Sequence, residues 1–215
     1  GPSTISDQFS SKVALRKLDM AATPWIKRIR ETKQLKVFNK AKSWATPVGT
    51  AIKSFNNLSL GVTLVSEKEE KSANVVLVLG ESSAPEYKYH DAYYGEVNVK
   101  TKPDFKPDRL HGRATPLMDA DSNEIFFAVI FLPGKLKKAT IGQKEVIVVH
   151  ELIHACGFDE HDSTGIMFST MMEQDGGLIE YFHEKDDKPM PPIRVGSQTR
   201  CKVKLLWSGE ACQKE

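Results

Sequence analysis

The sequence has no apolar run close to the roughly 20 residues that a membrane-spanning helix needs, which argues against a membrane span. It has only three cysteines among 215 residues, too few for a disulfide-based scaffold. It also lacks an excess of one charge, because 30 basic residues face 28 acidic ones and the net charge is +2. This balance argues against nucleic acid as the main partner. With 40% hydrophobic and 27% charged residues, the chain has the composition of one sizeable globular domain.

The two ends of the chain carry little information about the compartment. Residues 1–3 (Gly-Pro-Ser) resemble the remnant of a cleaved purification tag, and no signal-peptide pattern follows them. Cys201 and Cys212 stand eleven positions apart and could form a disulfide, which would leave Cys156 unpaired. The alternative is three free thiols.

Residues 4–43 form a basic N-terminal segment. Apolar residues such as Leu18 and Ile29 recur in it, and Pro24 interrupts the pattern. We therefore expect two short amphipathic helices, or a helix and a turn, in an extension that precedes the main domain. The Lys- and Arg-rich stretch Lys27–Lys42 is either a solvated helix face or a docking segment for an anionic partner.

From residue 44 onward the pattern is that of longer helices and strands. The almost wholly apolar run Glu124–Leu132 predicts a strand. The stretch Ile141–Cys156 is apolar nearly all round, which predicts a buried helix. The other expected elements are helices over Ala45–Leu58 and Arg194–Trp207 and strands over Gly61–Ser66 and Asn74–Leu79. This order predicts an α+β domain with a mixed sheet.

Two further segments have no strong pattern. Residues 81–107, which include four tyrosines, are expected to be loop-like. The acidic run Asp119–Glu124 has some features of a calcium loop, but it lacks the glycine and the distal glutamate of an EF-hand. A tight turn between two strands is the better interpretation.

The candidate catalytic and metal-binding residues of the chain are His150, Glu151 and His154. Residues four apart on a helix lie above one another, so the two imidazoles face one point. Zinc binds imidazole nitrogen at about 2.0–2.1 Å. A carboxylate beside such a site can act as a general base. The spacing therefore predicts zinc ligands at His150 and His154 and a base at Glu151.

A third ligand is expected soon after this helix. Gly157 is able to end the helix, and the chain can then turn back toward the metal. Glu160 and His161 are both within reach, and both residue types are established zinc ligands. Imidazole suits zinc and loops accept one-residue insertions, so we favour His161 and keep Glu160 as the alternative. Met167 follows six residues after His161.

These residues resemble the signature of the metzincin clan of zinc metallopeptidases. That signature is His-Glu-x-x-His-x-x-Gly-x-x-His or Asp, followed by a turn with a methionine beneath the zinc. His150, Glu151, His154 and Gly157 match it position by position, and Met167 resembles the methionine of the Met-turn.

The sequence departs from the clan's pattern at two positions. The third ligand of the clan falls on Glu160, and the histidine comes one residue later, at His161. Ser169 stands where some members carry a tyrosine that helps to hold the transition state. The first departure leaves the third ligand open between the two residues.

The resemblance implies a metzincin-like zinc peptidase fold: a mixed twisted sheet, an active-site helix above the cleft and a smaller, mostly irregular or helical C-terminal lobe. The catalytic domain would span residues 44–215, with an upper lobe to about residue 157 and a lower lobe over 158–215. The resemblance further implies one catalytic zinc ion, a secreted or exported protein, and hydrolysis of peptide bonds in a protein or peptide substrate with Glu151 as general base. An extended substrate would pair with an edge strand within Arg113–Leu132.

Other interpretations are weaker. A catalytically silent metzincin-like module that binds peptides or proteins would have no need of Glu151 as a base. A structural zinc site usually has four protein ligands and favours cysteine, and Cys156 points away from the His150/His154 face by helical phase. The sequence leaves the oligomeric state open.

Overall fold

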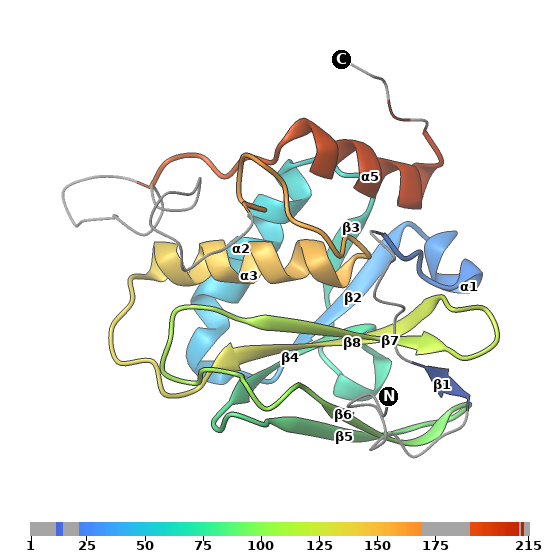
Figure 1. Ribbon diagram of the computed structural model, residues 1–215, viewed down its shortest axis with the longest axis horizontal. Coiled ribbons are helices and arrows are strands. Elements are labelled where there is room, and N and C mark those ends of the chain that lie inside the picture. Colours follow the sequence, from blue (N-terminus) through green and yellow to red (C-terminus); the bar gives the residue numbers. More distant parts are fainter. Residues whose placement is uncertain (1–11, 15–21, 169–189, 211, 213–215) are drawn as a thin grey trace.

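The computed structural model describes residues 12–14, 22–168, 190–210 and 212 (Figure 1). Residues 1–3, Ser169 and most of the expected N-terminal helical segment before residue 22 lie outside this part of the chain. The helices are α1 (Lys27–Arg30), α2 (Ala45–Asn57), α3 (Ile141–Ala155) and α5 (Ser197–Ser208), with 3₁₀ turns η2 (Lys42–Trp44) and η3 (Glu70–Ser72). The strands are β1 (Val13–Ala14), β2 (Gln34–Asn39), β3 (Thr63–Ser66), β4 (Val75–Gly80), β5 (Glu86–Asp91), β6 (Gly95–Lys100), β7 (Arg113–Asp119) and β8 (Ile125–Pro133).

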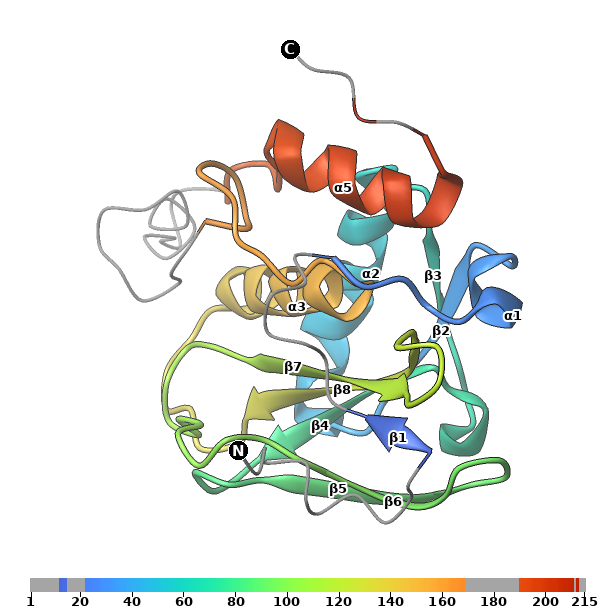
Figure 2. The same cartoon turned by 45° about the vertical axis from the view of Figure 1, so that its right-hand side comes forward.

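A mixed six-stranded sheet in the order β1-β7-β8-β4-β2-β3 forms the centre of the fold. Strands β8, β4, β2 and β3 run parallel to one another, and β7 pairs antiparallel with β8 and with β1. Helices α2 and α3 lie on one face of the sheet, and the β5–β6 hairpin lies on the other (Figures 1 and 2). The expected α+β class with a mixed sheet is confirmed.

Strand β8 is buried on both faces, which explains its continuous apolar sequence. Ile130 and Leu132 point into the core shared with the helices. Val129 and Phe131 point into the core beneath the hairpin. Both cores therefore hold β8 in place beside β7.

The sequence predicts helices, or a helix and a turn, in residues 4–43. Helix α1 agrees with this prediction, but for residues 34–39 it is wrong. Residues Gln34–Asn39 form strand β2, which lies inside the sheet between β3 and β4. Leu35 and Val37 are buried while Lys36 between them is exposed, a period of two that fits a strand. This part of the basic segment therefore belongs to the main core and is not an extension.

The loop-like expectation for residues 81–107 is also wrong. Strands β5 and β6 form an antiparallel hairpin there, with Asp91 opposite Gly95. Tyr87, Val97 and Val99 are buried in the second core. The alternation of these apolar residues with polar ones was the signal for the hairpin.

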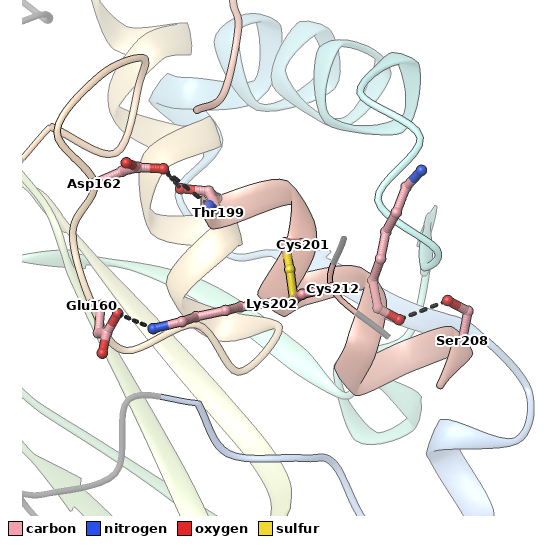
Figure 3. The surroundings of a disulfide bond; sticks show 8 residues. Glu160, Asp162, Thr199, Cys201, Lys202, Ser208 and Cys212 are labelled. Atoms are coloured by element: carbon pink, nitrogen blue, oxygen red, sulfur yellow. Dashed lines mark hydrogen bonds and ion pairs between the residues drawn. A yellow bond between two sulfur atoms is a disulfide. The ribbon is translucent and has the colours of Figure 1, made fainter. Parts of the chain in front are cut away.

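The other expected elements are confirmed to within a few residues. The run Asp119–Glu124 forms the expected turn between β7 and β8, and the Asp119 carboxylate accepts from the backbone N–H groups of Asp121 and Ser122. Among the described residues, no helix has both the length and the apolar character required to cross a bilayer. Cys201 and Cys212 are joined by a disulfide with their Cα atoms 5.1 Å apart (Figure 3), and Cys156 is a buried free thiol.

Candidate metal centre

Helix α3 carries the two spaced histidines and is held firmly at both ends. Thr140 and Gln143 form a capping box at its N-terminus. At its C-terminus the carbonyls of Ala155 and Cys156 accept hydrogen bonds from the indole N–H groups of Trp25 and Trp207, both at 2.9 Å. These bonds satisfy carbonyl groups that a helix end leaves unpaired.

Gly157 ends this helix as the sequence predicts. Its φ is +118°, in the region that favours glycine. A Cβ atom at this position would lie 2.2 Å from the carbonyl oxygen of Thr23, so the backbone of residues 22–23 approaches too closely for any side chain. The chain then turns toward the loop that contains Glu160 and His161.

Three histidines meet at the end of α3. His150 and His154 project from the helix and His161 from the following loop, and one ligand atom of each lies within 4.8 Å of the others. The Nε2 atoms of His150 and His154 are 3.1 Å apart. The structure therefore brings together the three histidines named from the sequence.

The backbone determines which ring nitrogens face the centre of this cluster. Nδ1 of His150 donates to the carbonyl oxygen of Ile166 at 2.7 Å, and Nδ1 of His154 donates to that of Phe158 at 2.8 Å. A neutral imidazole that donates from Nδ1 carries a lone pair on Nε2. The two Nε2 atoms thus face each other as acceptors, an arrangement that a cation between them would satisfy.

The surroundings of His150 and His161 favour the neutral form of each ring. Burial, with the proximity of His154, lowers the pKa of His150 well below its usual value. Burial also lowers the pKa of His161. Only the neutral ring offers a lone pair to a metal, so the donor set fits a divalent cation that accepts imidazole nitrogen, zinc among them.

Glu160 lies apart from this cluster. Its carboxylate accepts from Nζ of Lys202 on α5 at 2.6 Å (Figure 3). Of the two residues that the sequence left open as third ligand, His161 is the one beside His150 and His154.

Asp162 anchors the other side of the same loop. Its Oδ2 accepts from the backbone N–H of Thr199 at 2.9 Å and from the Thr199 hydroxyl at 2.8 Å (Figure 3). Gly196, the N-cap residue of α5, has no side chain to cap the helix, so Asp162 performs that role from the neighbouring loop. A Cβ atom on Gly196 would lie 2.4 Å from that carboxylate oxygen. His161 therefore sits between two side chains that are bonded to α5.

Met167 is fully buried in the main core, in the turn beneath the histidines. Its carbonyl oxygen accepts from the backbone N–H of Asp162 at 2.6 Å. The preceding residue, Ile166, accepts the hydrogen bond from His150. The turn that contains Met167 thus supports one histidine directly and the loop of another through the backbone.

Glu151 is directed toward the start of β7 and is only 3% exposed. Burial raises its pKa to about 8, although a hydrogen bond from the Ala114 backbone and the charge of Arg113 act in the opposite direction. Gly112 packs against this side chain, because a Cβ atom there would lie 2.8 Å from Cγ of Glu151. Sequence reasoning missed Gly112, Asp162 and Lys202, since no local pattern connects them to the motif.

The raised pKa of Glu151 predicts how the metal-free protein responds to pH. The folded state holds the proton more tightly than the unfolded chain, so the stability that this group contributes is complete below pH 4.5 and is lost as pH rises through about 8. Glu151→Gln removes this titration. We expect the variant to gain on the order of 3 kcal/mol over the wild type between mildly acidic and mildly alkaline pH. Urea denaturation of both proteins, with a chelator present, measures the free energy of unfolding at each pH. If this free energy depends on pH equally in both proteins, the prediction is contradicted.

No protein-family model matches this sequence, and a comparison with curated proteins finds no match either. The functional interpretation therefore depends on the geometry of the site.

Proposed function

We propose that this chain is a zinc-dependent endopeptidase of the metzincin type. The observation that carries the proposal is the convergence of His150, His154 and His161 with their ligand atoms within 4.8 Å. The buried Glu151 directly follows His150 in the sequence. Three imidazoles are a known ligand set for catalytic zinc. The turn around Met167 and the buried, neutral state of His150 agree with this assignment.

In this proposal, the residues of the chain have three roles: a general base, groups that position that base, and ligands of the metal. A bound zinc ion would polarise the substrate carbonyl and lower the pKa of a bound water. In its ionised form, which a nearby divalent cation favours over the protonated form of the metal-free protein, the carboxylate of Glu151 would accept a proton from the attacking water and return it to the nitrogen of the leaving amine. The Ala114 backbone and Gly112 hold that carboxylate in place. His150, His154 and His161 would hold the metal, and three protein ligands are the set found in catalytic zinc sites.

An extended substrate would bind along β7. Strand β1 pairs only with Met118 and Asp119, so no described strand pairs with the outer edge of Arg113–Leu117. The Ala114 N–H on β7 bonds Glu151 and Pro116 has no N–H, so this edge mainly offers backbone carbonyl groups. Main-chain hydrogen bonds to such an edge align a peptide without requiring a particular sequence. Ala114, which bonds Glu151, lies on this edge, so a peptide paired there would pass the base.

The test combines metal content with proteolysis. The purified chain loaded with zinc is expected to contain one ion per molecule and to cleave an unfolded protein such as casein. A chelator should stop cleavage, and added zinc should restore it. His154→Ala should lose both metal and cleavage. A chain that binds zinc in this ratio but cleaves no protein or peptide would instead favour the catalytically silent binding module.

Gly112→Ala is predicted to impair catalysis without loss of metal. The new Cβ would lie 2.8 Å from Cγ of Glu151 and 3.3 Å from the carbonyl oxygen of Phe131, and the buried carboxylate has little room to move. A displaced base lowers kcat by about 10²-fold. The matched control is Gly49→Ala on α2, where a Cβ meets no atom within 4 Å. Equal kcat values for Gly112→Ala and the wild type would show that Gly112 does not position the base.

A further inference from the structure

Basic side chains are concentrated on two segments: the loop that leads into β7 with the first residue of that strand, and the loop that leads from β8 with the first turn of α3. Residues 102–113 and 134–144 together contain eight Lys or Arg residues and only two Asp residues. Their excess of six positive charges exceeds the net charge of +2 for the whole chain, so the remainder of the sequence is net negative. We name these two segments the basic loops.

The basic loops lie side by side. Arg113 at the start of β7 pairs with Phe131 near the end of β8, so the two loops leave the sheet at the same end (Figures 1 and 2). The backbone N–H of Lys135 donates to the carbonyl oxygen of Pro107 at 2.8 Å. The ring of His111 packs on Phe105, with their centroids 4.9 Å apart. Contacts between and within the loops therefore hold one continuous surface.

Most of the positive charge on this surface is free to bind a ligand. Asp104 is already paired with Arg113. Five lysines are exposed and form no ion pair in the part of the chain that the structure describes: Lys102, Lys106, Lys135, Lys137 and Lys138. Their mutual repulsion is relieved when an anionic partner binds.

The first basic loop contacts Glu151, the residue that follows His150 on α3. Gly112, at the end of the first basic loop, packs against Glu151, and Ala114 bonds the same carboxylate. A peptide that follows the edge of β7 past Glu151 would continue over the basic loops. We propose that the basic loops dock an acidic polypeptide, and that the preferred substrates carry Asp and Glu residues on one side of the cleaved bond. The substrate part of this proposal rests on the proposed peptidase function.

The chemistry of the surface favours a polypeptide over nucleic acid. Proteins that bind single strands use exposed aromatic rings on which bases stack. Apart from His111, Phe105 is the single aromatic residue in the basic loops, and it is fully buried. Within the described part of the chain, no strand pairs with the adjoining outer edge of residues 113–117, and its backbone carbonyl groups suit an extended peptide.

Binding and cleavage are measured separately, so that the two proposals can fail independently. Binding is followed by fluorescence anisotropy with a labelled glutamate-rich peptide and its lysine-rich counterpart, on the zinc-loaded Glu151→Ala protein, which prevents hydrolysis. Lys137→Glu with Lys138→Glu is expected to weaken binding of the glutamate-rich peptide by about tenfold, as is a rise in salt concentration. The charge-matched control, Lys36→Glu with Lys68→Glu, reverses two exposed lysines outside the basic loops and should leave binding unchanged.

Cleavage sites are then mapped by mass spectrometry in a peptide mixture prepared from a denatured proteome. The wild type should cut where acidic residues lie on one side of the bond, and the Lys137/Lys138 variant should lose this preference. Cleavage without acidic enrichment, equal binding by both charge-reversal pairs, or tighter binding of an oligothymidylate than of the glutamate-rich peptide would each overturn the proposed docking surface. Charge-dependent peptide binding without any cleavage would support the surface and refute the peptidase function.

Discussion

Glu151→Gln in the zinc-loaded protein is expected to lower kcat by about 10²- to 10⁴-fold while the zinc content stays at the wild-type level. The amide has nearly the shape of the carboxylate but cannot accept a proton from water. It still fills the space beside Gly112 and can accept the hydrogen bond from the Ala114 backbone. The substitution leaves the three histidines unchanged, so the fall in kcat would be caused by the lost proton transfer.

The measurement pairs steady-state kinetics on a peptide substrate with metal analysis and thermal unfolding. Glu151→Ala should be equally inactive, although the truncated side chain also leaves a cavity in a fully buried position. Near-normal turnover in either zinc-loaded variant would refute Glu151 as the general base. A loss of zinc in both would show that the substitution disturbs the ligands instead.

Helix α3 is the element that the sequence predicts best, because the helical periodicity of its own residues determines it. The apolar residues of α3 and the spacing of His150 and His154 define a buried helix with one ligand-bearing face, and the structure has that helix over Ile141–Ala155. Gly157 marks its end because only glycine fits against Thr23. These features are local, so the sequence alone contains them.

Strand β2 was missed because its position depends on contacts that are distant in sequence. Its six residues are rich in polar side chains, and only Leu35 and Val37 are fully buried along it. Its partners are β3 and β4, and the register places Val37 opposite both Ser66 and Val75. A short alternation inside a basic segment does not reveal such pairing.

The third ligand was left open for the same reason. Spacing after Gly157 allows either Glu160 or His161, and the choice depends on α5, about forty residues further along the chain. Lys202 binds Glu160, and Thr199 binds Asp162, so the residue between them is directed toward the other histidines. Neither partner belongs to a recognisable motif.

His161→Ala is therefore expected to weaken zinc binding strongly, whereas Glu160→Ala should change it little. Removing a direct ligand should exceed the roughly 10- to 100-fold loss that follows removal of an outer partner of a metal site. Removing Glu160 breaks an ion pair with Lys202 in which both side chains are partly exposed, and such pairs contribute about 0–1 kcal/mol.

Competition with a chromophoric chelator measures zinc affinity for both variants and for Asp162→Ala. The Asp162 variant removes the cap of α5 but no ligand, so its affinity should lie between the other two. This intermediate value would separate a ligand from a residue that only positions one. The opposite order, with zinc lost in Glu160→Ala and kept in His161→Ala, would require the loop to leave Lys202 and turn by one residue when metal binds. Glu160 would then complete a two-histidine, one-carboxylate site.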